Sequence, residues 1–458
     1  MQERNTTQIT EGVIWKQLLA FFFPILLGTF FQQLYNTVDT IVVGRFVGTR
    51  ALAAVGSTSS LISLINGFFI GLSTGASVVV SQFYGAGDRN GVKRALSTGS
   101  VIALVLGILA VLVGVFCSPR LLQLIKTPEN CIADATTYAT LYFSGSIFIV
   151  IYNMGAGILR AMGDSKRPLY FLIVTCFTNI FLDILFVVIF KQGIAGAAVA
   201  TVLSQLISAV LVTVCIFRLS PDIRPSLLKP FVNGALVRRV LLIGIPAGLQ
   251  FVTFDLSNLL VQSGINSFGD IAVAAWAAYF KADSLTWMVS GAFGVAITTF
   301  VGQNFGAQKY GRIRQSVRTC LVMSIAAQLL LSSFILIFRK FILGIYTADA
   351  AVIQFGAYAM LWIVPFNALF MFVEVFAGTM RGTGYSVMPT VITGTCVCLF
   401  RILWVLTALP RWHTIEILCM TYPLSWIIAS AVFLIAYLRG TWLHKRIEIC
   451  GMEPEISA

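Results

Sequence analysis

Two aspartates, an asparagine and a threonine lie inside long apolar stretches, and their types and spacing suggest ion chemistry. Asn179 and Asp183 are four residues apart, which places them on one face of a helix. With Asp39 from an earlier stretch and Thr201 from a later one, they would form an oxygen-rich pocket. Hard cations prefer oxygen ligands, and two neighbouring carboxylates in a low-dielectric medium can hold a proton near neutral pH. We predict a site for sodium or a proton; the alternative is that the aspartates only accept hydrogen bonds from neighbouring helices.

A second group of ionisable residues lies in apolar stretches of the other half of the chain. It comprises Asp255, Lys281, Asp283, Glu374 and Arg401, which we expect to be buried. Lys281 and Asp283 are two residues apart and face different directions on a helix, whereas Glu374 and Arg401 could pair between helices. Asp255 and Glu374 are candidates for a second cation site or for contact with a cationic substrate. A structural network of ion pairs is the alternative.

Two further features concern packing. Gly67, Gly71 and Gly75 form a small-residue stripe at a spacing of four, which permits close approach of another helix. Several aromatic residues could line a cavity for flat cations by cation–π attraction, although lipid-facing positions are the more common: Trp276, Tyr279 and Trp287.

The elements that carry these residues are predicted to be transmembrane helices. Of 458 residues, 58% are hydrophobic and 11% charged, and the mean hydropathy is +0.90. Long uncharged stretches match the roughly 20 residues that a spanning helix needs, and they lack the alternation of barrel strands. We expect an all-α polytopic protein with twelve helices, near residues 14–43, 51–83, 95–117, 133–158, 168–190, 194–217, 240–264, 272–303, 316–338, 351–378, 387–409 and 416–438.

The chain repeats itself at an offset of 221 to 222 residues. Gln82 recurs as Gln303 within similar segments, and Arg160 recurs as Arg381. The repeat predicts two pseudosymmetric six-helix bundles related by an axis along the membrane normal, with a cavity between them. The expected limits are 1–217 and 240–445 for the bundles, 218–239 for a cytoplasmic linker and 446–458 for a cytoplasmic tail.

The two halves differ in their ionisable residues. Three acids align with amides or an aromatic residue in the other half: Asp183 aligns with Trp404, Asp255 with Gln33, and Glu374 with Asn153. This divergence suggests that the halves have different tasks, although drift can also produce it.

Charge placement predicts the orientation in the membrane. If both termini are cytoplasmic, 21 of the 31 Lys and Arg residues fall in cytoplasmic segments, as the positive-inside rule requires. We therefore expect a multi-pass protein of the cell membrane. The net charge of +13 then reflects contact with anionic lipids and does not indicate nucleic acid.

Several functional classes lack their sequence signatures. The chain has no Walker A motif, no TVGYG filter, and no nucleophile with a base, and its two histidines lie at or beyond the predicted helix ends. We therefore predict that it is not an enzyme, needs no cofactor and binds no metal beyond possible sodium.

The motifs resemble those of the multidrug and toxic compound extrusion (MATE) family. They are the run from Pro24 through Gln32-Gln33-Leu34-Tyr35-Asn36-Thr37-Val38-Asp39, the paired segments at Gln82 and Gln303, and the Arg160-Ala161-Met162-Gly163-Asp164 loop. The resemblance covers nearly the whole chain. It implies twelve helices in two bundles and export of cationic or amphipathic organic compounds in exchange for protons or sodium.

The resemblance also implies roles for residues. The family's first-bundle ion site uses an Asp, an Asn with an Asp, and a Thr, which Asp39, Asn179, Asp183 and Thr201 match in order. Some members use acids of the seventh and tenth helices instead, where Asp255 and Glu374 fall, so the coupling ion and its lobe stay open.

These observations lead to a functional hypothesis with two rivals. We expect a monomeric alternating-access antiporter that exports drugs or toxins, and we expect these substrates to be organic cations. A flippase for lipid-linked saccharides would need a strongly basic groove, but acids outnumber the buried bases. A channel or receptor would need a continuous pore or a soluble domain, for which the short loops leave no room.

Overall fold

All regular secondary structure is helical within the residues that the structure, a computed structural model, describes: 9–124, 127–225 and 231–449. The first half contains α1 (Ile14–Val42), η1 (Val43–Val47), α2 (Thr49–Gly85), α3 (Arg89–Leu124), α4 (Ile132–Ser144), α5 (Ser146–Ala161), α6 (Lys166–Asp183), η2 (Ile184–Ile189) and α7 (Gly193–Phe217). The segments η1 and η2 are π-helical.

The second half contains α8 (Gly234–Asn266), α9 (Asp270–Gly306), α10 (Tyr310–Ile337), α11 (Arg339–Tyr346), α12 (Ala350–Ile363), η3 (Val364–Phe366), α13 (Asn367–Gly382), α14 (Val387–Thr393), η4 (Gly394–Leu399), α15 (Phe400–Thr407), α16 (Leu409–Trp412), α17 (Ile415–Leu438) and α18 (Thr441–Ile449). Pro365 lies in the 3₁₀ break η3, whereas Pro24 and Pro246 lie inside α1 and α8. The short helices α11, α16 and α18 were not predicted from the sequence.

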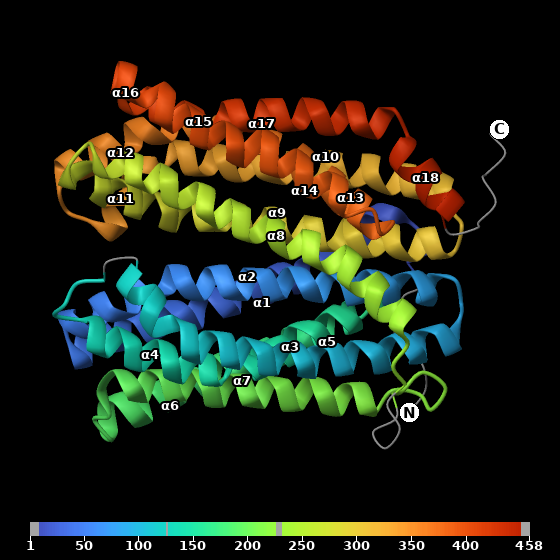
Figure 1. Cartoon of the computed structure of the whole chain (residues 1–458). Helices are drawn as coiled ribbons and strands as arrows, with labels where there is room; N and C mark the ends of the chain where they lie inside the picture. Colours follow the sequence, from blue (N-terminus) through green and yellow to red (C-terminus); the bar gives the residue numbers. More distant parts are fainter. Residues whose placement is uncertain (1–8, 125–126, 226–230, 450–458) are drawn as a thin grey trace. The chain divides into compact units, whose positions relative to one another are not determined.

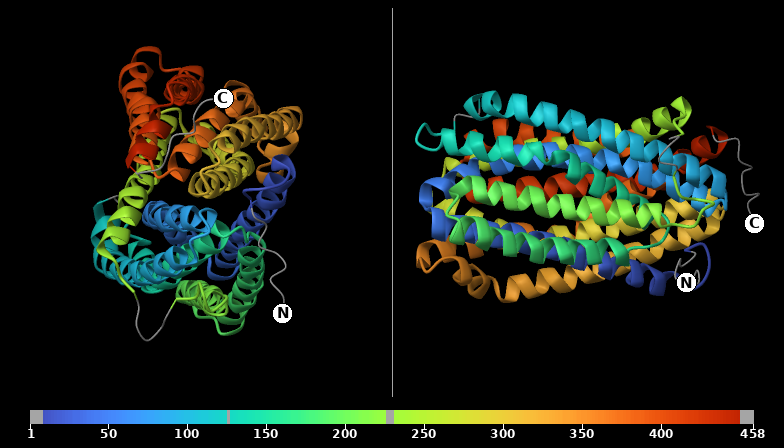
Figure 2. Two further views of the ribbon diagram at one scale, coloured as in Figure 1. Left: turned by 90° about the vertical axis from the view of Figure 1, so that its right-hand side faces the viewer. Right: turned by 90° about the horizontal axis from the view of Figure 1, so that it is seen from below.

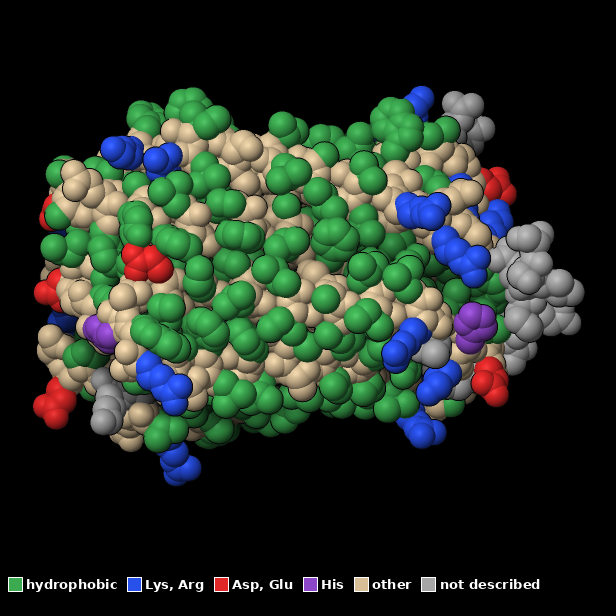
Figure 3. Space-filling view, turned by 90° about the horizontal axis from the view of Figure 1, so that it is seen from above, with side chains coloured by type: hydrophobic (Ala, Val, Ile, Leu, Met, Phe, Trp, Pro, Cys, Tyr) green, Lys and Arg blue, Asp and Glu red, His purple; other side chains and the backbone are tan. Residues whose placement is uncertain are grey.

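Up to twelve candidate membrane spans account for most of the described residues. Eleven are single helical stretches, and the twelfth is the pair α4 and α5, which bends by 45° between Ser144 and Ser146. On the face shown in Figure 3, hydrophobic side chains cover the middle of the helices, and Lys and Arg lie near their two ends. The predicted fold class, an all-α polytopic membrane protein, is confirmed.

The repeat seen in the sequence is also present in the backbone conformation. Gly48 precedes α2 with a φ of 116°, and Gly269, 221 residues later, precedes α9 with a φ of 85°. Because a side chain is strained in this left-handed region, glycine marks the same turn in both halves. Gly163 and Gly384, at 91° and 87°, do the same after α5 and α13.

The described residues divide into two compact units that exchange parts of their first helices. The N-terminal unit comprises residues 23–251, and the C-terminal unit comprises Ile9–Phe22 together with the chain from Val252. The division therefore falls within α1 and within α8. Helices α2 to α7 pack on one another in the N-terminal unit, and α9, α10, α13 and α17 in the C-terminal unit (Figures 1 and 2). The predicted linker, 218–239, overlaps the start of α8, and its residues 226–230 lie outside the described residues.

The exchanged part of α8 contacts α2 through backbone. A Cβ atom at Gly71 would lie 2.3 Å from the Cα of Gly248, and one at Gly75 would lie 2.2 Å from the carbonyl oxygen of Val240. Only glycine allows this approach, so close packing at Gly71 and Gly75 is confirmed. In the C-terminal unit the exchanged part of α1 packs differently, because Phe22 stacks on Phe293 of α9 with ring centroids 4.2 Å apart.

Candidate functional site

The predicted ion-site residues of the N-terminal unit are all buried and come from three helices. Asp39 lies near the end of α1, Asn179 and Asp183 lie on α6, and Thr201 lies on α7. Asn179 and Asp183 have no exposed surface, and Asp39 and Thr201 are 6% and 5% exposed. Asp39 and Asp183 lie close enough for their charges to interact.

Contacts between helices fix this geometry. The amide of Gln205 on α7 donates to the hydroxyl of Tyr35 on α1 at 3.1 Å, one helical turn before Asp39. Gly28 brings α1 close to Leu172 of α6, since a Cβ atom there would lie 3.0 Å from that side chain. The π-helical segment η2 begins directly after Asp183, and such segments are frequent at functional sites.

A tyrosine that the sequence did not single out lies near the two aspartates and interacts with both. Tyr138 of α4 is buried, and its hydroxyl donates to Asp39 Oδ2 over a long 3.4 Å. Both Asp39 and Asp183 interact electrostatically with this phenol. Because α4 precedes α6 by a whole helix, no spacing in the sequence could have placed Tyr138 there.

Most polar atoms of this site have no partner within the described residues. They are Asp39 Oδ1, both carboxylate oxygens of Asp183, and both amide atoms of Asn179. Thr201 donates to the carbonyl of Ala197 at 3.1 Å, which leaves its oxygen free to accept. A buried polar atom without a hydrogen bond costs roughly 1–3 kcal/mol. The four unpaired oxygens therefore form a site suited to a proton or to a small hard cation.

In the C-terminal unit, by contrast, the carboxylate of the buried Asp283 accepts hydrogen bonds on both oxygens. Asp283 Oδ1 accepts from Thr286 at 2.6 Å and from Asn367 at 3.2 Å, and Oδ2 accepts from Trp287 at 2.7 Å. Thr286 and Trp287 follow Asp283 by three and four residues, so the spacing on α9 could have identified them. Asn367 comes from α13 and gave no signal in the sequence. No Lys or Arg in the described part of the chain forms an ion pair with Asp283.

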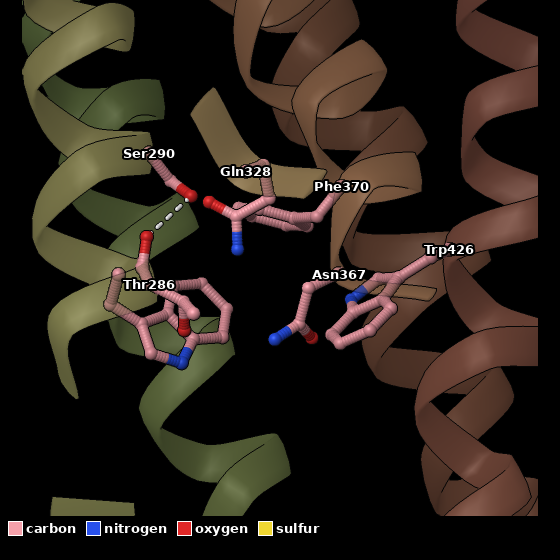
Figure 4. A pocket seen from close by; sticks show the side chains of 7 residues that line it. Thr286, Ser290, Gln328, Asn367, Phe370 and Trp426 are labelled. Carbon is pink, nitrogen blue, oxygen red and sulfur yellow. Dashed lines mark hydrogen bonds between the residues drawn. The ribbon is translucent and has the colours of Figure 1, made fainter. Parts of the chain in front are cut away.

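A hollow opens beside Asp283. It has a volume of about 180 Å³, including space open to solvent, and is lined by three aromatic and four polar residues: Thr286, Trp287, Ser290, Gln328, Asn367, Phe370 and Trp426. The amides of Gln328 and Asn367 project into it (Figure 4). Of the three aromatic residues proposed as cavity-lining, Trp287 lines this hollow, and Trp276 and Tyr279 are buried, so lipid-facing positions are wrong for those two.

Three expectations for the second group are corrected. Glu374 does not pair with Arg401; it accepts from Arg381 at 3.0 Å, because residues seven apart on α13 share a face. Lys281 is exposed, because it points away from the side of α9 that buries Asp283. Asp255 on α8 is only partly buried, like Glu374. The structure therefore does not gather these five residues into one site.

Comparison with known proteins gives the family. The MatE family model matches residues 24–185 and again residues 246–406, which together cover more than half of the chain. The chain belongs to this family. The two matches begin at Pro24 and Pro246, a pair that the sequence repeat aligns. The chain is a multidrug and toxic compound extrusion family transporter.

Relatives and solved structures agree with this assignment. The chain is 30% identical to "Probable multidrug resistance protein YpnP" of Bacillus subtilis over 96% of this chain and 98% of that protein. It is 21% identical to "Multidrug export protein MepA" of Staphylococcus aureus over 89% and 91%. The fold matches "Crystal structure of MATE in the bent conformation" with a TM-score of 0.89 at 21% identity, covering 97% of this chain and 99% of that one.

Proposed function

We propose that the chain is a secondary active antiporter that exports cationic or amphipathic organic compounds in exchange for protons or sodium. The observation that supports this most strongly is the set of unpaired oxygens on Asp39, Asn179 and Asp183. Such atoms persist in a membrane interior when a ligand satisfies them for part of a working cycle.

The carboxylate site can couple ion entry to a change of conformation. Two charges on Asp39 and Asp183 repel each other while the site is empty, and a proton or sodium removes that repulsion. The ion must bind one conformation more tightly than the other, or no coupling arises. Neutralisation of the pair lets α1 and α6 pack more closely, which supplies that difference in alternating access.

The hollow in the C-terminal unit supports a cationic cargo. Trp287, Phe370 and Trp426 present aromatic faces, and such faces attract cations, most strongly where water is excluded. Asp283 adds a negative charge that no described Lys or Arg neutralises. The hollow as it stands admits only a water-sized molecule, so a flat organic cation would meet these aromatic faces and the charge of Asp283 in a more open state of the transport cycle.

Reconstituted vesicles test the coupling. Wild-type protein should export a cationic dye when an inward proton or sodium gradient is imposed, and Asp39→Asn and Asp183→Asn should each reduce that export at least tenfold. Asp134→Asn is the matched control, because Asp134 lies in the same unit but pairs with Arg50 near the surface. Undiminished export by the two site variants would refute this role of the carboxylates.

The same vesicles separate the two ions and the rival function. A pH gradient without sodium drives export only in a proton-coupled protein, and a sodium gradient with a protonophore drives it only in a sodium-coupled one. Gradient-independent movement of a lipid-linked saccharide would instead support a flippase.

We also propose that both termini are cytoplasmic. The excess of Lys and Arg in the corresponding segments supports this orientation. A reporter that is active only in the cytoplasm should be active when fused to the C-terminus, and inactivity of a stable fusion would contradict the orientation.

A further inference from the structure

Arg401 is a buried cation that lacks a carboxylate partner within the described residues. It lies on α15 and is 1% exposed. Its Nε donates to Ser425 Oγ at 3.2 Å, and its Nη1 donates to Asn258 Oδ1 at 3.2 Å. The guanidinium carbon lies 4.2 Å from the ring centroid of Tyr422. These neutral contacts orient the guanidinium, but they leave its positive charge unbalanced.

Several unpaired polar atoms around Arg401 can donate hydrogen bonds. Arg401 Nη2, the Tyr422 hydroxyl, and the indole nitrogens of Trp276 and Trp426 are buried and have no partner in the described part of the chain. The rings adjoin: the Tyr422 centroid lies 6.1 Å from that of Trp276 and 5.8 Å from that of Trp426. Guanidinium and indole N–H groups can only donate, so the missing partner is an acceptor.

No acid among the described residues of the C-terminal unit takes this position. Asp283 interacts with Tyr279 and Tyr422, and these two tyrosines, with Cys398, are the titratable groups whose charge interacts with Arg401. The carboxylate of Asp283 is already occupied by Thr286, Trp287 and Asn367. The charge on Arg401 therefore has no counter-ion among the described residues, and an isolated charge in a low-dielectric interior is costly.

The repeat shows that this place corresponds to the carboxylate site of the N-terminal unit. Asn258 aligns with Asn36, Ser425 with Ser204, and Arg401 with Ile180, the neighbour of Asn179. The same junction of the first, fifth and sixth helices of a bundle thus holds unpaired oxygens in one unit and an unpaired guanidinium nitrogen in the other.

We propose that the C-terminal unit binds one small monovalent inorganic anion, of the chloride type, at Arg401 Nη2 and the hydroxyl of Tyr422. One such anion balances the single guanidinium charge, and it accepts N–H and O–H hydrogen bonds from several directions. Trp276 and Trp426 stand next to the site, so their fluorescence reports on its occupancy. This inference is independent of the coupling ion proposed for Asp39 and Asp183.

Purified protein in detergent tests the proposal directly. Sodium gluconate is replaced by sodium chloride at constant ionic strength, and Tm and tryptophan quenching by iodide are followed. We expect a saturable rise of Tm with chloride, and competition between chloride and iodide. Absence of a saturable response would overturn the proposal.

Variants locate the site. Tyr422→Phe keeps the ring under the guanidinium and removes only the hydroxyl, so it should raise the chloride midpoint on the order of tenfold, the effect of one hydrogen bond to a charged group. Arg401→Gln should abolish the response. Arg411→Gln, on the exposed part of α16, is the control and should behave as wild type. Should Arg401→Gln fail to fold, an unchanged midpoint in Tyr422→Phe would still overturn the assignment.

Discussion

The two units share one helical framework but bury opposite chemistry in it. In the N-terminal unit the buried carboxylates of Asp39 and Asp183 keep unpaired oxygens. In the C-terminal unit Asp283 has donors on both oxygens, and the buried guanidinium of Arg401 keeps an unpaired nitrogen. The carboxylates of the N-terminal unit are therefore free to bind a cation. The carboxylate of Asp283 in the C-terminal unit is already hydrogen-bonded on both oxygens. A repeated backbone does not impose a repeated function.

The units also hold their exchanged helices by different means. Glycines let α8 reach the backbone of α2 in the N-terminal unit, whereas Phe22 of α1 stacks on Phe293 in the C-terminal unit. The first contact tolerates no added atom, and the second depends on the atoms that are present. This contrast is as informative about folding as the polar sites are about transport.

The largest effects should come from these helix contacts. Gly71→Ala places a Cβ atom 2.3 Å from backbone and should destabilise the fold by about 1–3 kcal/mol or more. Phe22→Ala empties a stacked, buried position and should cost about 3–5 kcal/mol. Gly56→Ala is the control on α2, where an added Cβ meets no atom within 4 Å. Thermal unfolding in detergent measures all three, and equal Tm values for Gly71→Ala and Gly56→Ala would remove the first half of the contrast.

The next largest difference should separate the acids of the two units. Asp283→Asn replaces an oxygen that accepts a hydrogen bond with a donor, so we expect a loss of about 1–3 kcal/mol. Asp183→Asn should leave stability unchanged or raise it, because it removes a charge whose oxygens have no partner. Tm is compared in buffer free of sodium and near neutral pH. A larger loss for Asp183→Asn than for Asp283→Asn would show that the carboxylate site is structural.

A smaller difference in stability should separate variants that loosen the segment before α1 from variants that loosen the segment before α8. Arg312 donates five hydrogen bonds to Ile9, Glu11, Gly12 and Gln17, whereas Ser97 accepts one from the amide of Phe231. Arg312→Ala should cost about 1–2 kcal/mol, since the site is partly exposed, and Ser97→Ala about 1 kcal/mol. Limited proteolysis of the N-terminal segment should speed up only in Arg312→Ala; equal rates in both variants would contradict the difference.

The smallest effect should come from two surface ion pairs, one in each unit. Arg89 pairs with Asp222 in one unit, and Lys309 with Glu11 at 3.6 Å in the other. Ser220 and Arg89 hold the pKa of the Asp222 carboxyl below its usual range. A lowered pKa stabilises the fold above about pH 4, the ordinary value, and the effect disappears as the pH falls through the folded-state pKa. Because exposed pairs are screened by salt, Asp222→Asn and Glu11→Gln should lower Tm only slightly at neutral pH and physiological ionic strength. A clear drop would show that these pairs hold the segments in place.

Much of the polar geometry could not be foreseen from spacing. The neighbours of Asp283 on its own helix follow the three- and four-residue rule, but Asn367 and Tyr138 reach their acids from other helices. The pairing expected for Glu374 failed because a partner two turns away on the same helix, Arg381, was available. Local patterns report on one helix at a time, whereas a buried polar group takes whichever partner the packing brings nearest.

The membrane-spanning helices, the internal repeat and the burial of Asp39, Asp183 and Asp283 could be predicted from the amino-acid sequence alone, because hydrophobic length and periodicity act along the chain. The tertiary structure decided which of those acids are satisfied and which helices cross from one unit to the other. It also decided that Arg401 stands without a carboxylate among the described residues. Those properties depend on the contacts of side chains far apart in sequence, and each contact is settled by packing and desolvation rather than by residue type.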